Sequence, residues 1–293
     1  MRIGTRASAL AMVQAEWVAQ ELGGRAAGVE IVPITTLGDR GTALQDKSRW
    51  VSELERALLE DRIDLAVHSA KDVPTELPGG LELVAVPARA DARDALCGAE
   101  SLDGLPGGAR VGTSSLRRAA QIRARRDDLD VVELRGNVDT RLRKLAEGQV
   151  DALVLALAGL QRLGLAARAG GAIDAFVPAA GQGALALEAR AGALDADAVA
   201  AVIDAPAMAC VTAERELVHA LGASCHTPVG AHARPHGDGT LTMAAWVGLP
   251  DGSQWLADEV RGPAEAVGAE CARRMLAAGA GELLARAERE TAV

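Results

Sequence analysis

The sequence of 293 residues contains almost no aromatic side chains: four Trp, one Phe and no Tyr. A surface that stacks single-stranded bases is built from such side chains, so little material is present for one. Positive charge is also scarce, because 31 Lys and Arg face 40 Asp and Glu and the net charge is −9. Nucleic acids and anionic membranes both favour a basic surface, and we expect neither as a partner.

Long apolar runs and cysteine pairs are missing as well. No run reaches the roughly 18 apolar residues that a membrane span needs, and the first residues lack the apolar core of a signal peptide, so we expect a cytoplasmic protein. The four cysteines, Cys97, Cys210, Cys225 and Cys271, are too few and too scattered for a disulfide framework or a C-x-x-C zinc site, and we expect no metal. A free cysteine is ordinarily a small buried hydrophobe.

The sequence does contain an alternation of short apolar runs and amphipathic segments, which predicts an α/β fold with largely parallel sheets. In the first lobe we expect strands at 2–5, 29–34 and 64–68 and helices at 9–22 and 50–59. In the second lobe we expect strands at 109–112, 130–134 and 152–156 and helices beginning at Ser115, Asp139 and Gly159. A strand at 184–188 is expected to return to the first sheet.

The last third of the chain has a different character. A helix is expected at 207–221, and the turns at 238–239 and 251–252 carry Asp-Gly, which favours antiparallel hairpins. A long Ala-rich helix is expected from Pro263 onward. We therefore predict three domains: 1–87 with 183–203 and 88–182, both α/β lobes, and 204–293, a small α+β domain.

Arginines follow the predicted strand ends. The set consists of Arg6, Arg117, Arg118, Arg135, Arg141 and Arg162. Around Ser115 a strand turns into a helix, whose free N–H groups already favour an anion, and guanidiniums add bidentate recognition of carboxylate or phosphate. Several such arginines indicate a ligand with several negative groups. The alternative is that they only form surface ion pairs with acidic neighbours.

Lys71 and Asp72 place a cation beside a carboxylate directly after a buried strand. This pair suits a site that holds an acidic group while it handles a proton, although a surface ion pair has the same sequence pattern. His68, inside the strand, is interpreted as a core histidine.

Eight segments, in order, resemble the porphobilinogen deaminase family, also called hydroxymethylbilane synthase. They are residues 5–8 (TRAS), 68–74 (HSAKDVP), 112–118 (GTSSLRR), 135–137 (RGN), 158–164 (AGLQRLG), 181–183 (GQG), 212–215 (TAER) and 225–230 (CHTPVG). The resemblance covers nearly the whole chain.

The resemblance implies a monomeric transferase of tetrapyrrole and heme biosynthesis. Such an enzyme joins four porphobilinogen molecules head to tail, loses ammonia each time and yields hydroxymethylbilane. Its first two domains resemble type II periplasmic binding proteins. Its primer is a dipyrromethane held by a cysteine thioether, which here falls on Cys225, and a thiolate is a competent nucleophile for capturing the electrophilic methylene.

The resemblance also implies residue roles. Asp72 matches the catalytic aspartate, which contacts pyrrole N–H groups, assists departure of the amine and stabilises the cationic azafulvene. The incoming substrate is expected at Arg6, Ser8, Arg135 and Arg162. The primer is expected at Lys71, Asp72, Ser115, Arg117 and Arg118, with Arg141 between the two.

The sequence departs from the family pattern in two places: residues 39–50 form a shorter lid region, and Ala223-Ser224 stands where Gly-Gly is usual before the anchor. Two alternatives stay open. A binding module for small anions predicts no covalent adduct and no need for Cys225. A divergent paralogue with a changed pyrrole substrate predicts an adduct but poor turnover of porphobilinogen.

Overall fold

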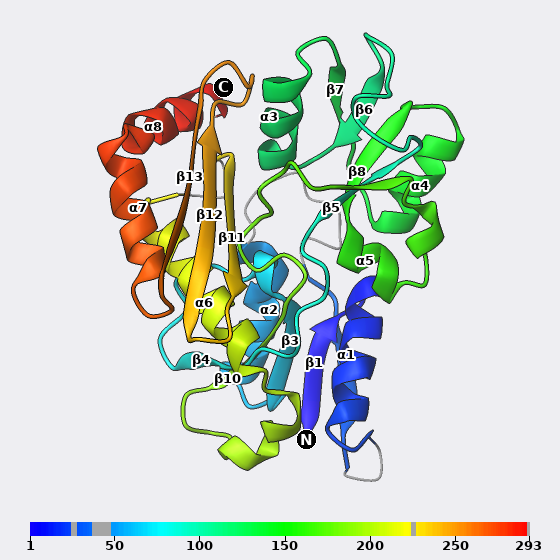
Figure 1. The fold of residues 1–293 in the computed structure, drawn as a ribbon. Coiled ribbons are helices and arrows are strands. Elements are labelled where there is room, and N and C mark those ends of the chain that lie inside the picture. Colours follow the sequence, from blue (N-terminus) through cyan, green and yellow to red (C-terminus); the bar gives the residue numbers. More distant parts are fainter. Residues whose placement is uncertain (25–27, 37–47, 224–226, 292–293) are drawn as a thin grey trace. The chain divides into compact units, whose positions relative to one another are not determined.

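The computed structural model describes residues 1–24, 28–36, 48–223 and 227–291, drawn as ribbons in Figure 1. The chain divides into two compact units. Unit 1 comprises Met1–Ala90 and Gly183–Thr212, and unit 2 comprises Asp91–Gln182 and Ala213–Val293. No helix in these described ranges is long and apolar enough to cross a membrane.

Unit 1 contains a five-stranded sheet with the order β2-β1-β3-β10-β4. The strands are β1 (Arg2–Arg6), β2 (Glu30–Ile34), β3 (Leu65–Ser69), β4 (Leu81–Ala85) and β10 (Leu185–Arg190). Strand β1 is parallel to β2 and β3, whereas β10 is antiparallel to β3 and β4. The predicted return of the chain to the first sheet is thus confirmed, and β4 is a strand that the sequence did not predict.

Two helices pack on this sheet, α1 (Ala9–Glu21) and α2 (Ser48–Leu59). Side chains along a strand alternate between its two faces, and β3 is buried on both. Leu65 and Val67 pack in one core with Val18 of α1, whereas Ala66 packs in another core with Leu54 of α2. The two helices therefore cover opposite faces, which explains the unbroken apolar run in β3.

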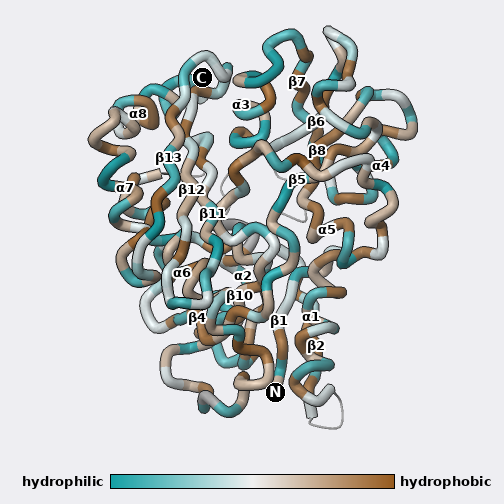
Figure 2. The backbone as a smooth tube through the Cα atoms, in the orientation of Figure 1, coloured by the Kyte–Doolittle hydropathy of each residue, from teal (hydrophilic) through white to brown (hydrophobic). Residues whose placement is uncertain are grey.

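The α/β sheet of unit 2 has five strands in the order β7-β6-β8-β5-β9. They are β5 (Asp94–Cys97), β6 (Arg110–Thr113), β7 (Asp130–Glu133), β8 (Ala152–Ala156) and β9 (Gly171–Ile173). Its helices are α3 (Leu116–Arg125), α4 (Val138–Ala146) and α5 (Leu157–Arg162). Strand β5 is antiparallel to β8 and β9, so this sheet repeats the arrangement of the first; Figure 2 shows the hydrophobic stretch of β8 in brown. Strands β5 and β9 were not predicted.

A three-stranded antiparallel sheet follows, with strands β11 (Val229–Pro235), β12 (Thr240–Gly248) and β13 (Trp255–Pro263). The helices of this region are α6 (Ala205–Ala220), α7 (Val267–Ala277) and α8 (Ala280–Thr291). Both Asp-Gly hairpins are confirmed. The prediction of a single long helix from Pro263 is wrong, because two helices are present. Helix α7 ends before Gly279, whose φ of 101° lies in the left-handed region.

Four short 3₁₀ turns complete the described elements: η3 (Ala70–Asp72), η4 (Ala166–Arg168), η5 (Ala196–Ala198) and η6 (Ala200–Val202). The two α/β sheets, together with a three-stranded sheet and helices near the C-terminal end, confirm the predicted fold class.

The hairpin turn between β12 and β13 packs closely against α3 inside unit 2. Arg123 donates from Nη1 to the carbonyl of Pro250 at 2.8 Å. Gly252 lies in this turn with φ +75°, and a Cβ built there would stand 2.5 Å from the backbone nitrogen of Ala124. The position therefore requires glycine both for its backbone conformation and for its space.

We expect Gly252→Ala to lower the free energy of unfolding by about 3 kcal/mol, because left-handed strain and overpacking against α3 add. Gly239→Ala is the matched control: its φ is +80°, but nothing lies within 4 Å of the added Cβ, so strain alone should cost about 1 kcal/mol. Urea unfolding of both variants tests this, and equal losses of stability would contradict it.

Candidate functional site

A pocket in unit 1 lies at the carboxyl ends of β1 and β3. Its wall includes Arg6, Ser8, Gln14, His68, Ser69 and Asp72. Ligands of open α/β sheets bind at the carboxyl ends of parallel strands, so the location agrees with a functional site. The pocket brings together three residues that the sequence singled out: Arg6, Ser8 and Asp72.

Local structure fixes the position of each of these three residues. Arg6 is the last residue of β1, and the Ser8 side chain caps α1 by accepting a hydrogen bond from the Ala11 backbone nitrogen at 3.4 Å. Asp72 closes the turn η3, which is held because the Ala70 backbone N–H donates to the carbonyl of Ala184 at 3.0 Å. Strand, cap and turn together present a cation, a hydroxyl and a carboxylate to one pocket.

Lys71 lies in the same turn as Asp72 and is half-buried, but it is not part of the pocket wall. Two pocket residues that the sequence analysis did not single out are Gln14 and Ser69. The Gln14 amide donates from Nε2 to Ser69 Oγ at 3.1 Å, linking α1 to the end of β3. No local sequence pattern predicts this hydrogen bond, because Gln14 and Ser69 are 55 residues apart in the sequence.

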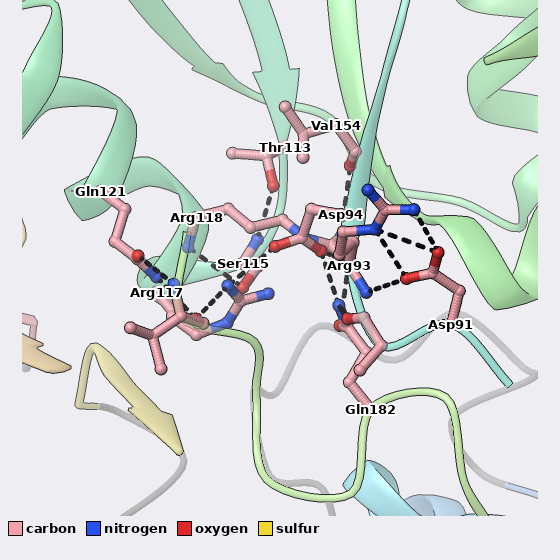
Figure 3. Close-up of polar contacts among 12 residues, drawn as sticks. Asp91, Arg93, Asp94, Thr113, Ser115, Arg117, Arg118, Gln121, Val154 and Gln182 are labelled. Atoms are coloured by element: carbon pink, nitrogen blue, oxygen red, sulfur yellow. Dashed lines mark hydrogen bonds and ion pairs between the residues drawn. The ribbon is translucent and has the colours of Figure 1, made fainter. Parts of the chain in front are cut away.

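A second group of predicted site residues, the arginine cluster, lies in unit 2 and begins where β6 turns into α3. Ser115 caps α3 by accepting from the Arg118 backbone nitrogen at 3.4 Å. Arg117 and Arg118 are 4% and 5% exposed, so neither is a surface residue. Both approach the carboxylate of Asp94 at the start of β5: Arg117 Nη1 lies 2.8 Å from Oδ2, and Arg118 Nη2 lies 2.8 Å from Oδ1 (Figure 3).

Asp94 is a functional candidate that the sequence analysis missed. Its side chain is fully buried, and burial alone would raise the pKa of this carboxyl. The charges of Arg117 and Arg118, with hydrogen bonds from Arg117 and Gln182, outweigh burial and hold the pKa of Asp94 well below its usual range. Asp94 is therefore a fixed negative charge between two buried positive ones.

Neighbouring amides complete this network. Gln182 donates from Nε2 to Asp94 Oδ1 at 2.8 Å and to the Ala92 carbonyl at 2.6 Å. Gln121 accepts from the Val177 backbone nitrogen at 2.8 Å and donates to the Val177 carbonyl at 3.0 Å. The Val177 carbonyl also accepts from Arg117 Nη1 at 2.9 Å. The orientation of the arginine pair is thus set by several fixed partners.

The remaining predicted arginines of unit 2 differ in their surroundings. Arg135 is exposed and pairs with Glu133 at 2.6 Å. Arg141 donates from Nε to the Gly136 carbonyl at 2.7 Å, and its pKa is lowered to about 10 by burial and by the charge of Arg118. Burial also lowers the pKa of Arg162, the last residue of α5, to about 10. Both remain cations at neutral pH, and a bound anion would offset the cost of burying them.

Cys225 and Ser224, the predicted anchor and its neighbour, lie outside the described residues, as does 39–47 of the lid region. The other three cysteines, Cys97, Cys210 and Cys271, are buried, as predicted. Burial raises the pKa of Cys97 to about 11 and that of Cys271 to about 12, so these thiols are poor nucleophiles at neutral pH. Within the described ranges, no group of three or more His, Cys, Asp or Glu is placed to hold a metal ion.

Two family models match the chain. The model described as porphobilinogen deaminase, dipyromethane cofactor binding domain, matches residues 1–198, and the model described as porphobilinogen deaminase, C-terminal domain, matches residues 208–277. Curated relatives are also called porphobilinogen deaminase. That of Deinococcus deserti is 48% identical over 96% of this chain and 97% of its own length. That of Bordetella parapertussis is 49% identical over 97% of this chain and 95% of its own.

Among solved structures, the chain is similar to a nutrient-binding protein from Burkholderia cenocepacia bound to methionine. It is 15% identical, has a TM-score of 0.44, and the match covers 68% of this chain and 90% of that one. A TRAP periplasmic solute-binding protein from Desulfovibrio salexigens is 14% identical, with a TM-score of 0.41 and coverage of 68% and 69%.

We expect Asp94→Asn to lower the free energy of unfolding at pH 7 by about 3 kcal/mol, because it leaves two buried guanidiniums without their carboxylate. Folding lowers the pKa of Asp94. The charged carboxylate therefore contributes fully to the free energy of unfolding above its unfolded pKa of about 3.9, and this contribution decreases progressively as the pH falls below that value. The difference between the variant and the parent should therefore shrink toward pH 3.

Urea unfolding at pH 7 and pH 3 measures this difference. Asp127→Asn, which changes an exposed carboxylate two residues beyond α3, is the control and should leave stability nearly unchanged at both values. A difference for Asp94→Asn that is the same at pH 7 and pH 3 would argue against a charged Asp94.

Proposed function

The chain belongs to the porphobilinogen deaminase family. From this premise we propose that the pocket of unit 1 and the arginine cluster of unit 2 have different roles in the reaction. The enzyme is a transferase that joins four porphobilinogen molecules head to tail into hydroxymethylbilane, releasing ammonia at each addition, and its cofactor is a dipyrromethane. The observation that carries the assignment of Asp72 is that its carboxylate shares one pocket wall with Arg6 and Ser8.

The catalytic role is assigned to Asp72. When the C–N bond of the aminomethyl group breaks, the electron pair leaves with nitrogen as ammonia departs, and the carbon becomes electron-poor. A carboxylate beside the pyrrole accepts a hydrogen bond from its N–H and stabilises the positive charge that develops. Arg6 and Ser8 hold a substrate carboxylate, which fixes the ring against Asp72.

Substrate carboxylates are also assigned to Arg135 and Arg162 of unit 2. Arg162 suits this role because it is a half-buried cation whose pKa is lowered by burial. Arg135 has to exchange its contact with Glu133 for the substrate, which an exposed ion pair allows at little cost.

The residues of unit 2 fit a dipyrromethane, whose side chains are carboxylates. Two buried guanidiniums, Arg117 and Arg118, face the single carboxylate of Asp94, and Arg141 adds a third partly buried cation. The excess of positive charge is complementary to an acidic ligand. Ser115, at the N-terminus of α3, adds a hydroxyl where the helix dipole favours an anion.

Lys71, Asp72 and Arg141 are assigned to the cofactor together with these residues, and Cys225 is assigned as its thioether anchor. When bound, the dipyrromethane supplies the pyrrole carbon to which the first substrate unit is joined. The protein's part is to hold its carboxylates and to exclude other anions.

Three further assignments belong to the proposal. The chain is divided into domains at 1–87 with 183–203, 88–182 and 204–293. The protein is assigned as a monomer, and light scattering measures its mass in solution. Its compartment is assigned as the cytoplasm.

We expect Asp72→Asn to lower the steady-state rate at least about 100-fold while the protein stays folded, since a neutral amide cannot offset the developing charge. Formation of hydroxymethylbilane from porphobilinogen is the measurement. Glu76→Gln, an exposed position four residues along, is the control and should keep the parent rate. A near-normal rate in Asp72→Asn would remove that residue from the mechanism.

We expect Arg117→Leu to reduce the fraction of purified protein that carries two linked pyrrole units, because a cation that binds their carboxylates is lost. The intact mass of the denatured protein gives this fraction, and peptide digestion gives the modified residue, expected to be Cys225. Arg125→Leu changes an exposed arginine at the end of the same helix and should retain the adduct.

Arg117→Lys separates charge from geometry and should carry an intermediate fraction of adduct. Full adduct in Arg117→Leu contradicts the assignment of this arginine. A parent chain that stays unmodified after incubation with porphobilinogen or hydroxymethylbilane contradicts the primer-bearing mechanism and favours a binding module.

A further inference from the structure

Three titratable side chains lie buried in unit 1 and have no part in the reaction as described. They are Glu55 of α2, His68 of β3 and Glu188 of β10. Their exposed fractions are 7%, 4% and 0%. Burying three ionisable groups is costly unless charge is compensated among them. We call this set the buried proton cluster.

The sheet register explains how two members meet. His68 is opposite Ala186 on β10, and Glu188 is opposite Ala66 on β3, so both side chains project from the same face at diagonal positions. The small Ala186 leaves room for the imidazole. Nε2 of His68 lies 2.9 Å from Oε2 of Glu188.

The carboxylates of the cluster lack enough donors. Both carboxylate oxygens of Glu188, Oε1 of Glu55 and Nε2 of His68 are buried and make no hydrogen bond among the described residues. A buried carboxylate oxygen without a donor favours the protonated form. Burial and then the charge of Glu188 raise the pKa of Glu55 to about 7, with His68 opposing them.

Other charged groups lie on the elements that pack against α2. They are Arg2 and Arg6 of β1, Glu82 of β4, Arg190 of β10, and Lys71 and Asp72 of η3. Arg2 pairs with Asp61 and Asp64, and Arg190 pairs with Asp61. The charges that change the pKa of Glu55 are those of Glu188, which raises it, and His68, which lowers it.

The cluster reaches the pocket through His68, which shares its wall with Arg6 and Asp72. We propose that Glu55, Glu188 and His68 are positioning residues beneath this pocket, that Glu55 carries an exchangeable proton, and that the charge of the cluster acts on the groups which Asp72 and Arg6 bind. The inference rests on the functions proposed for Asp72 and Arg6. When Glu55 ionises, its proton goes to solvent and the cluster gains one negative charge.

The added negative charge has two opposite effects in the pocket. It stabilises the positive charge that develops on the substrate carbon, which raises kcat. It repels the substrate carboxylate that Arg6 holds, which raises KM. Each parameter is expected to rise about threefold as pH increases through 7, a change that one screened charge can produce.

The test compares the pH dependence of kcat and KM for porphobilinogen in the primer-loaded enzyme and in Glu55→Gln, which keeps the shape but cannot titrate. The variant is expected to lose the rise of both parameters around pH 7. Glu60→Gln, an exposed position just beyond α2, is the control and should keep the parent profile. Profiles of Glu55→Gln that superimpose on the parent overturn the proposal.

A second readout does not depend on activity. The ¹⁵N signals of the five histidine rings are followed through pH 5–9, and His68 is assigned by comparison with His68→Gln. The His68 signal should show a step near pH 7 that Glu55→Gln abolishes, and absence of that step in the parent overturns the proposal. Because the step does not require turnover, it separates this inference from the test of Asp72 by Asp72→Asn.

Discussion

The contact of two buried guanidiniums with one buried carboxylate is the interaction on which the second α/β sheet depends. Without Asp94, the side chains of Arg117 and Arg118 would be like charges in a medium that solvates neither. With it, the group still carries one uncompensated positive charge. This uncompensated charge links the stability of the fold to ligand binding, because an acidic ligand that offsets the charge also stabilises the folded protein.

The two α/β sheets place comparable residues at comparable strand ends, since β1 and β6 occupy the same position in their sheets. Each of these strands leads into a helix capped by a serine, Ser8 in one case and Ser115 in the other. The difference lies in what accompanies the cap. Unit 1 adds the carboxylate of Asp72, which suits stabilisation of a cation, whereas unit 2 adds arginines, which suit retention of anions.

Much of this arrangement could be predicted because its signals are local. The caps at Ser8 and Ser115, the arginines that follow strand ends and the hairpin glycines are each visible within a few residues of sequence. Asp94 could not be found this way, since it belongs to a strand of four residues and its partners lie 23 and 24 positions away. Only the antiparallel return of β5 beside β8 brings them together.

His68 is a second residue whose partner could not be predicted from the local sequence. A histidine inside an apolar strand was correctly interpreted as part of the core, yet the sequence could not tell that Glu188, 120 positions later, would meet it on the same face. A core built only for stability would place apolar side chains at these positions, because pairing buried charges rarely exceeds the cost of desolvating them. Retaining ionisable groups directly beside the pocket therefore favours a role in its electrostatics over a role in packing.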